Sequence, residues 1–137
     1  MKTIPDSNIL FDIIQRDPVW LSWTMDKLQH SREAGQLVAN TIVYAEVSGH
    51  FSDQGELRNL FSRVGIELES IPWEAAYLAG RAHRAYRHAG GTRTRVLPDF
   101  LVGAHAATMG YHLITRDAAR YRTYFPELDI IAPDTHP

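Results

Sequence analysis

The chain of 137 residues contains no cysteine, which excludes disulfide bonds and thiolate metal sites. It also lacks an apolar run long enough to cross a bilayer, and it has no N-terminal signal pattern. Hydrophobic residues make up 45% of the chain and charged residues 22%, which are ordinary values for a globular protein. We therefore expect a single cytoplasmic domain over residues 1–137, with residues 133–137 as a loose tail.

Lysine is scarce, and most of the positive charge comes from arginine. Because Lys2 and Lys27 are the only lysines, a two-component receiver domain is a poor fit, since it needs a lysine after its fifth strand. The formal net charge of −2 provides no bulk attraction to nucleic acid. Residues 81–95, however, carry five arginines, two histidines and no acid. Such a segment is compatible with a solvated helix face and with a phosphate-binding surface.

Short apolar runs alternate with longer segments of helical period, a pattern typical of an α/β protein with a mostly parallel sheet. We predict strands over residues 2–6, 36–40, 66–71, 111–115 and 128–132. We predict helices over residues 7–14, 18–35, 41–47, 53–64, 73–89 and 98–110, with a short last helix ending at Tyr124. The predicted N-caps include Ser7–Asn8, Asp17 before Pro18, and Thr41. The small residues of the 98–110 helix predict close packing on the sheet.

Four acidic residues follow these elements in a way that predicts one common site. Asp6 and Asp117 come directly after apolar strands, Asp99 opens a helix, and Glu46 lies within an apolar helix, where we expect it to be buried. Sites in parallel sheets form beyond the carboxyl ends of the strands. Each acid alone could be a helix cap or a first-turn acid. Together they favour a Mg²⁺ or Mn²⁺ site, because clustered carboxylates repel one another without a cation.

Four strings of residues, in this order, resemble the PIN-domain ribonucleases and, more narrowly, the VapC-type toxins of prokaryotic toxin–antitoxin modules. They are IPDSNIL at 4–10, VYAEV at 43–47, LPDFLVGAHA at 97–106 and LITRD at 113–117. The resemblance implies a three-layer α/β/α sandwich around a mostly parallel five-stranded sheet. It also implies that the metal ions are held by Asp6, Glu46, Asp99 and Asp117. Ser7, Asn8 and Thr115 match polar positions that orient carboxylates or water. The stretch at 100–103 departs from the Ala- and Ile-rich family pattern but removes no ligand.

The resemblance implies a metal-dependent endoribonuclease that leaves a 5′-phosphate and a 3′-hydroxyl, with Mg²⁺ or Mn²⁺ as cofactor. It further implies a homodimer and a cognate antitoxin that neutralises the toxin. Residues 9–14 and 18–28 match the antitoxin groove through Phe11, Trp20, Trp23 and Met25, although plain core packing explains these side chains equally well.

Arginine side chains are the candidates for holding the RNA backbone, because their planar forks match phosphate oxygens. These candidates are Arg81, Arg84, Arg93 and Arg95. Arg116 either does the same or pairs with a carboxylate, and we expect His105 to pack in the core rather than act in catalysis. A catalytically idle PIN-like module that binds RNA or a partner protein is the alternative function.

Overall fold

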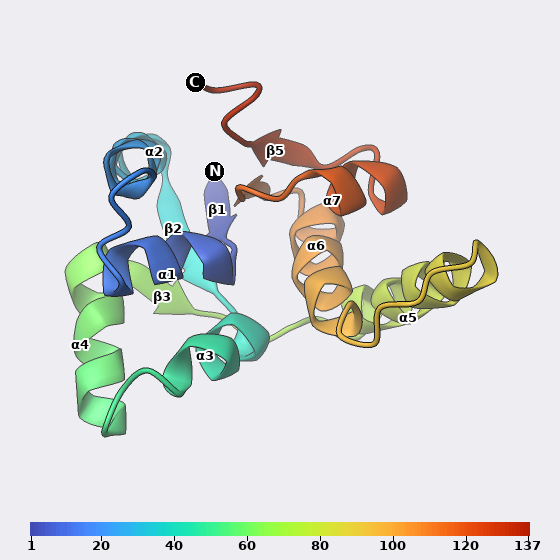
Figure 1. Cartoon of the computed structure of the whole chain (residues 1–137), viewed down its shortest axis with the longest axis horizontal. Helices are drawn as coiled ribbons and strands as arrows, with labels where there is room; N and C mark the ends of the chain where they lie inside the picture. Colours follow the sequence, from blue (N-terminus) through green and yellow to red (C-terminus); the bar gives the residue numbers. More distant parts are fainter.

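The computed structural model describes residues 1–137 as a five-stranded parallel sheet with seven helices (Figure 1). The strands are β1 (Lys2–Pro5), β2 (Gln36–Ala39), β3 (Ile66–Leu68), β4 (His112–Ile114) and β5 (Asp129–Ile131). The helices are α1 (Ser7–Ile14), α2 (Leu21–Ala34), α3 (Thr41–Ser48), α4 (Gln54–Val64), α5 (Trp73–His88), α6 (Leu97–Met109) and α7 (Ala119–Tyr124). Helices α1, α2 and α4 lie on one side of the sheet and α5, α6 and α7 on the other, which confirms the predicted three-layer sandwich.

The strand order is β3-β2-β1-β4-β5, so β1 lies at the centre of the sheet. The chain first adds β2 and β3 on one side of β1, and then returns to add β4 and β5 on the other. Ile4 is paired with Leu113, and Thr3 with Leu37. The order therefore reverses between β1 and β4, and a parallel sheet opens a crevice beyond the strand ends at such a point.

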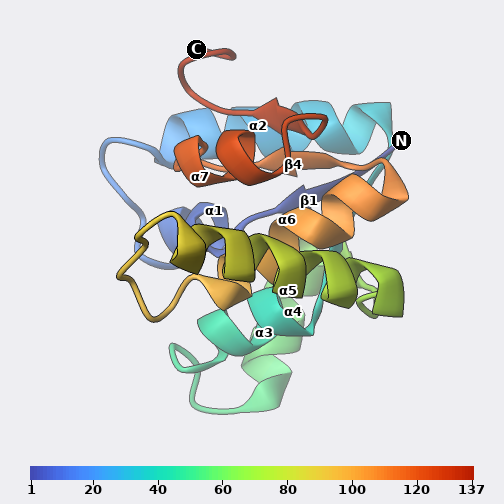
Figure 2. The same cartoon turned by 90° about the vertical axis from the view of Figure 1, so that its right-hand side faces the viewer.

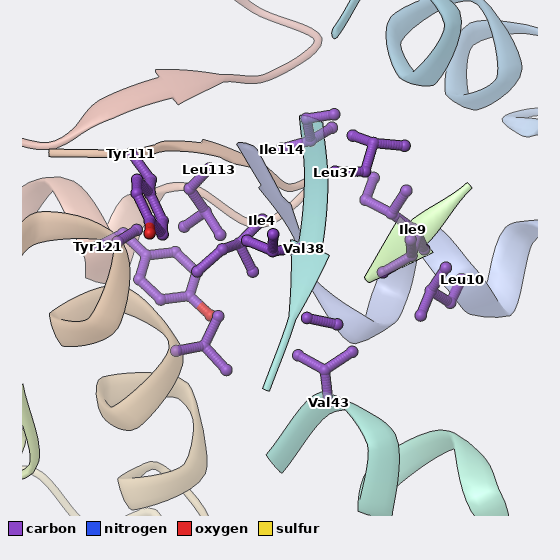
Figure 3. Packing of buried hydrophobic residues seen from close by; sticks show 14 of the residues in the cluster. Ile4, Ile9, Leu10, Leu37, Val38, Val43, Tyr111, Leu113, Ile114 and Tyr121 are labelled. Carbon is purple, nitrogen blue, oxygen red and sulfur yellow. The ribbon is translucent and has the colours of Figure 1, made fainter. Parts of the chain in front are cut away.

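The core lies on both faces of the sheet, as expected when every strand is parallel. Leu37, Val38 and Ala39 are consecutive and all buried, so both sides of β2 are covered. Figure 3 shows Leu37 on the side of α1, and Leu113 on the side of Tyr121 from α7. Fully removing each such aliphatic side chain from water contributes about 1.5–3 kcal/mol to folding.

Helices α1 and α3 begin where predicted but with different N-caps, and α2 begins three residues later than predicted. The N-cap of α1 is Asp6, whose side chain accepts a hydrogen bond from the Ser7 amide, rather than Ser7–Asn8. The N-cap of α3 is Asn40, one residue before the predicted Thr41. Asp17 does accept bonds from the backbone amides of Val19 and Trp20, but residues 18–20 form a turn and α2 begins at Leu21.

Helix α6 crosses the middle of its layer, with α5 packed outside it (Figure 2). The prediction that its small residues pack closely on the sheet needs a correction at Gly103. A Cβ atom there would come within 2.8 Å of Tyr121 and Phe125, so the missing side chain makes room for α7 and the residue that follows it. This close approach brings Tyr121 over the carboxyl end of β1.

The two ends of the chain are held to neighbouring elements. Near the N-terminus, Lys2 donates a hydrogen bond to Glu69. Glu69 lies just beyond β3, which ends at Leu68 rather than at the predicted Ile71. In the C-terminal segment 133–137, the carbonyl of His136 accepts a hydrogen bond from the Trp23 indole of α2. None of the helices has the length and apolar character needed to cross a membrane.

Candidate metal centre

Asp6 is the central acid of the candidate site, because it ends β1 at the point where strand order reverses. Its side chain is buried, and three groups donate to it. One carboxylate oxygen accepts from the Ser7 amide at 2.8 Å. The other accepts from the hydroxyl of Thr115 at 3.0 Å and from that of Tyr121 at 2.8 Å. Burial raises the pKa of Asp6, these hydrogen bonds oppose the rise, and the nearby charge of Asp117 adds to it.

Asp99 lies in the first turn of α6 and faces the same crevice. The guanidinium Nη1 of Arg120 donates to its Oδ2 at 2.6 Å. The pKa of Asp99 is nevertheless raised to about 6, because desolvation and the charge of Asp6 outweigh the effect of Arg120. The carboxylates of Asp6 and Asp99 are therefore close enough to repel each other.

Glu46 extends from α3, and its residue is exposed, which corrects the prediction of a glutamate buried in an apolar helix. Only Val43 and Val47 form the buried face of α3. The pKa of Glu46 is still raised to about 7, by desolvation first and then by the charges of Asp6 and Asp99. The exposed residue thus places its carboxylate toward the other acids, and solvent screens part of the repulsion.

Asp117 is exposed and follows β4, and its neighbour Thr115 connects the polar groups of the site. The Thr115 hydroxyl donates to Asp6 and accepts from the Asn8 amide group at 3.1 Å and from the Asp117 backbone amide at 3.1 Å. Asn8 also accepts from the Arg116 backbone amide at 3.3 Å. Thr115 therefore contacts Asp6 directly and Asn8 contacts it through Thr115, while Ser7 contributes its backbone amide.

Two residues of this site, Arg120 and Tyr121, were missed by the sequence analysis. Both belong to α7 and contact Asp99 and Asp6, which are 21 and 115 positions away in the chain, so no local pattern in the sequence could have identified them. Tyr121 is buried, and desolvation with the charge of Asp6 keeps its pKa well above the ordinary value. It therefore remains a neutral hydrogen-bond donor to Asp6.

Arg116 pairs with a carboxylate, which is one of the two alternatives left open by the sequence. Its Nε and Nη2 donate to the two oxygens of Asp12 at 2.9 and 2.8 Å. Asp12 is 1% exposed and also accepts from the Thr24 hydroxyl at 2.7 Å. The guanidinium lies 5.3 Å from the ring centre of Trp20. Arg116 thus ties the segment after β4 to α1 and α2.

The other predicted RNA-binding arginines are all exposed. Arg81 and Arg84 lie on the outer face of α5, where Arg81 is 5.9 Å from the Tyr77 ring centre. Arg93 and Arg95 lie in the loop that leads into α6 and Asp99. Arg81 and Arg84 therefore lie on a helix face, whereas Arg93 and Arg95 lie in the loop next to the acids.

The donor chemistry of the four acids fits Mg²⁺ or Mn²⁺, although no three histidine, aspartate or glutamate side chains are arranged to hold an ion as they stand. The hydrogen bonds to Asp6 and Asp99 explain why. The Oδ2 of Asp6 already accepts from both Tyr121 and Thr115, and the Oδ2 of Asp99 accepts from Arg120. The electrostatics of the site favour a cation. The charge of Asp6 raises the pKa of Asp99, and the charges of Asp6 and Asp99 raise the pKa of Glu46. Carboxylates supply the hard oxygen ligands that Mg²⁺ and Mn²⁺ prefer.

No family model and no curated protein sequence matches the chain. Solved structures do match it. A chain of VapBC2 from Rickettsia felis bound to a promoter DNA fragment matches with a TM-score of 0.74 and 15% identity, over 96% of this chain and 98% of that one. VapBC-1 from nontypeable Haemophilus influenzae matches with a TM-score of 0.70 and 18% identity, over 96% and 98%. A toxin–antitoxin complex from Klebsiella pneumoniae matches with a TM-score of 0.64 and 22% identity, over 96% and 97%.

These likenesses span 96% of this chain and 97–98% of the matched chains, so they concern the complete sandwich rather than a shared motif. The chain therefore has the PIN-like α/β fold found in VapBC toxin–antitoxin complexes.

Proposed function

We propose that this protein is a Mg²⁺- or Mn²⁺-dependent endoribonuclease that acts as the toxin of a toxin–antitoxin pair. The observation that supports this most directly is the gathering of acids around the buried Asp6 at the carboxyl edge of the sheet, where the charge of Asp6 raises the pKa of both Asp99 and Glu46. A buried acid with two acidic neighbours is costly to a metal-free fold. A site that binds a divalent cation recovers that cost on binding.

The ion would be held by Asp6, Glu46, Asp99 and Asp117. A divalent ion bound there would activate water and polarise the scissile phosphate. The chain's own contribution is to orient these ligands. Thr115 and Tyr121 both donate to the Oδ2 of Asp6 and so orient its carboxylate, and Asn8 holds the Thr115 hydroxyl. Arg93 and Arg95, on the loop before Asp99, would bind the RNA backbone, with Arg81 and Arg84 extending the basic surface along α5.

Cleavage of total cellular RNA by the purified protein tests the nuclease directly. We expect fragments with Mg²⁺ or Mn²⁺, no fragments with EDTA, and no fragments from Asp6→Asn or Asp99→Asn. The matched control is Asp26→Asn, an exposed acid on α2 outside the site. Near-wild-type cleavage by either site variant would contradict the assignment. RNA binding without cleavage, together with no effect of Mg²⁺ on the melting temperature, would favour the idle binding module.

A cavity of about 620 Å³ between α1, α2 and α4 is the proposed binding groove for the antitoxin. Its apolar lining includes Ile13, Met25, Leu28 and Leu60. Met25 was predicted for this role, whereas Trp20 and Trp23 pack edge to face against each other with centres 6.1 Å apart. The groove lies apart from the acids, and its rim carries Arg16, Arg32 and Arg63. Its shape and charge suit an apolar peptide segment with acidic flanks.

The groove is tested by co-expressing the chain with the protein encoded beside it. We expect a complex that survives purification and is lost in Leu60→Glu or Met25→Glu. Val19→Glu provides the control, because Val19 is an exposed apolar residue outside the groove. Equal recovery of the complex with all variants would contradict this position for the antitoxin.

The outer face of α5 is the proposed contact of a homodimer. Trp73 is 92% exposed and Tyr77 64%, although both are large aromatic side chains. Tyr77 lines a groove together with the small residues Ala76 and Gly80, where a second helix could approach closely. In an antiparallel arrangement of two copies, the exposed aromatic side chains of each α5 would be covered by the other copy. A dimer by sedimentation that dissociates in Tyr77→Glu but not in Val19→Glu is the expected result.

A further inference from the structure

Helix α7 places a cationic side chain on the proposed metal ligand Asp99. Arg120 Nη1 lies 2.6 Å from Asp99 Oδ2, and the Arg120 side chain is only 17% exposed. The same helix turn places the Tyr121 hydroxyl on Asp6. Both acids therefore have partners from α7.

Arg120 is positioned by an aromatic support from three helices. Its guanidinium lies 6.0 Å from the ring centre of Tyr86 on α5. The Tyr86 ring packs edge to face with Phe100 of α6 and Tyr124 of α7, with ring centres 5.9 and 6.2 Å apart. Stacking on an aromatic face limits the side-chain freedom of an arginine. The ion pair with Asp99 is thus preorganised rather than a chance surface contact.

We propose that Arg120 is an internal counter-cation that competes with the divalent ion for Asp99. This inference depends on the proposed function, because it assumes that the acids bind a metal. Arg120 lowers the repulsion among Asp6, Asp99 and Asp117 when no ion is bound, and it must leave Asp99 Oδ2 for the ion to use that oxygen. Breaking the pair adds to the free energy of metal binding. Arg120 thereby raises the free-ion concentration at which the site fills.

The competition is tested by measuring Mn²⁺ affinity without RNA, by isothermal titration calorimetry and by the Mn²⁺ electron paramagnetic resonance signal. We expect Arg120→Ala to bind Mn²⁺ roughly 10-fold more tightly than the wild type, which corresponds to about 1.4 kcal/mol. Arg120→Lys keeps the charge and should stay nearer the wild type. Arg122→Ala is the matched control, because Arg122 is on the same helix and pairs with Asp134, outside the site. It should bind Mn²⁺ like the wild type.

The possible outcomes separate this inference from the proposed function. Equal Mn²⁺ affinity in wild type and Arg120→Ala overturns the competition and leaves the metal site in place. Binding by Arg120→Ala that is tighter than binding by the wild type supports both. If neither protein binds Mn²⁺ while both give native circular dichroism spectra, the metal site and the competition both fail. Should Arg120→Ala not fold, Arg120→Gln removes the charge with less loss of volume and gives the same comparison.

Discussion

The imidazole Nε2 of His105 lies 2.9 Å from Oε2 of Glu69, although the two residues are 36 positions apart in the chain. On its other side, the Nδ1 of His105 lies 3.1 Å from the side-chain amide nitrogen of Asn40. The oxygen of Asn40 accepts the backbone amides of Ile42 and Val43. Asn40 therefore donates to Nδ1, and the proton of His105 is on Nε2, directed at Glu69. The expectation that His105 packs in the core is confirmed, since it is fully buried.

Replacing His105 by leucine should lower the free energy of unfolding by roughly 2 kcal/mol, because buried polar partners are left unsatisfied. Asn40 loses the group that holds it as the cap of α3, and Glu69 loses one of its three donors. Urea denaturation of the metal-free protein measures the change. His30→Leu, at an exposed position on α2, serves as the control. A loss no larger than that of the control would show that the network contributes little.

Replacing Tyr121 by phenylalanine should lower the free energy of unfolding by about 1–2 kcal/mol, because the buried carboxylate of Asp6 loses a donor. The ring and its packing against Gly103 remain, so the change isolates the hydroxyl. Urea denaturation in EDTA measures it, with the half-buried Tyr124→Phe on the same helix as the control. Identical stability of the two variants would mean that Asp6 is satisfied without Tyr121.

Replacing Arg116 by methionine should lower the free energy of unfolding by roughly 3 kcal/mol, because the buried Asp12 would lose its charged partner. The double variant Asp12→Leu with Arg116→Met should recover most of this loss, since no unpaired charge remains. Arg95→Met, at an exposed loop position, should leave stability unchanged. If Arg116→Met were as stable as Arg95→Met, the pairing with Asp12 would be unimportant and the role of Arg116 would lie in RNA binding.

In EDTA, the stability of the wild type relative to Glu46→Gln should fall as the pH rises. The folded pKa of Glu46 is raised from 4.5 to about 7, so between these values the folded protein binds more protons than the unfolded chain. The contribution of Glu46 is therefore fully present below pH 4.5 and is lost as the pH rises through 7. Asp99 acts in the same direction between 3.8 and about 6 and is common to both proteins.

Denaturation curves at several pH values between 4.5 and 8 test this pH dependence. Mg²⁺ should reduce the difference between low and high pH in the wild type, because it stabilises the ionised carboxylates. A wild-type stability that follows that of Glu46→Gln at every pH would show that Glu46 titrates as it does in the unfolded chain.

The sequence determined the type and order of the elements, because these depend on local patterns. Apolar runs, helical periods and turn residues predicted five strands and seven helices, and the acids after strands predicted one edge of a sheet for Asp6 and Asp117. A local pattern does not show which of two adjacent residues is the N-cap when both favour that position, as Asn40 and Thr41 do. The different N-caps of α1 and α3 follow from that ambiguity.

Only the tertiary structure decided which side chains contact the acids. Tyr121 reaches Asp6 across 115 positions, and Arg116 reaches Asp12 across 104, so both contacts depend on β4 lying beside β1. Strand order is set by burial over the whole sheet and leaves no local pattern in the sequence. The helical period in the sequence placed Glu46 on an apolar helix and so predicted that it is buried. In the structure, α3 packs through Val43 and Val47, which leaves Glu46 exposed. Its carboxylate nevertheless faces Asp6 and Asp99.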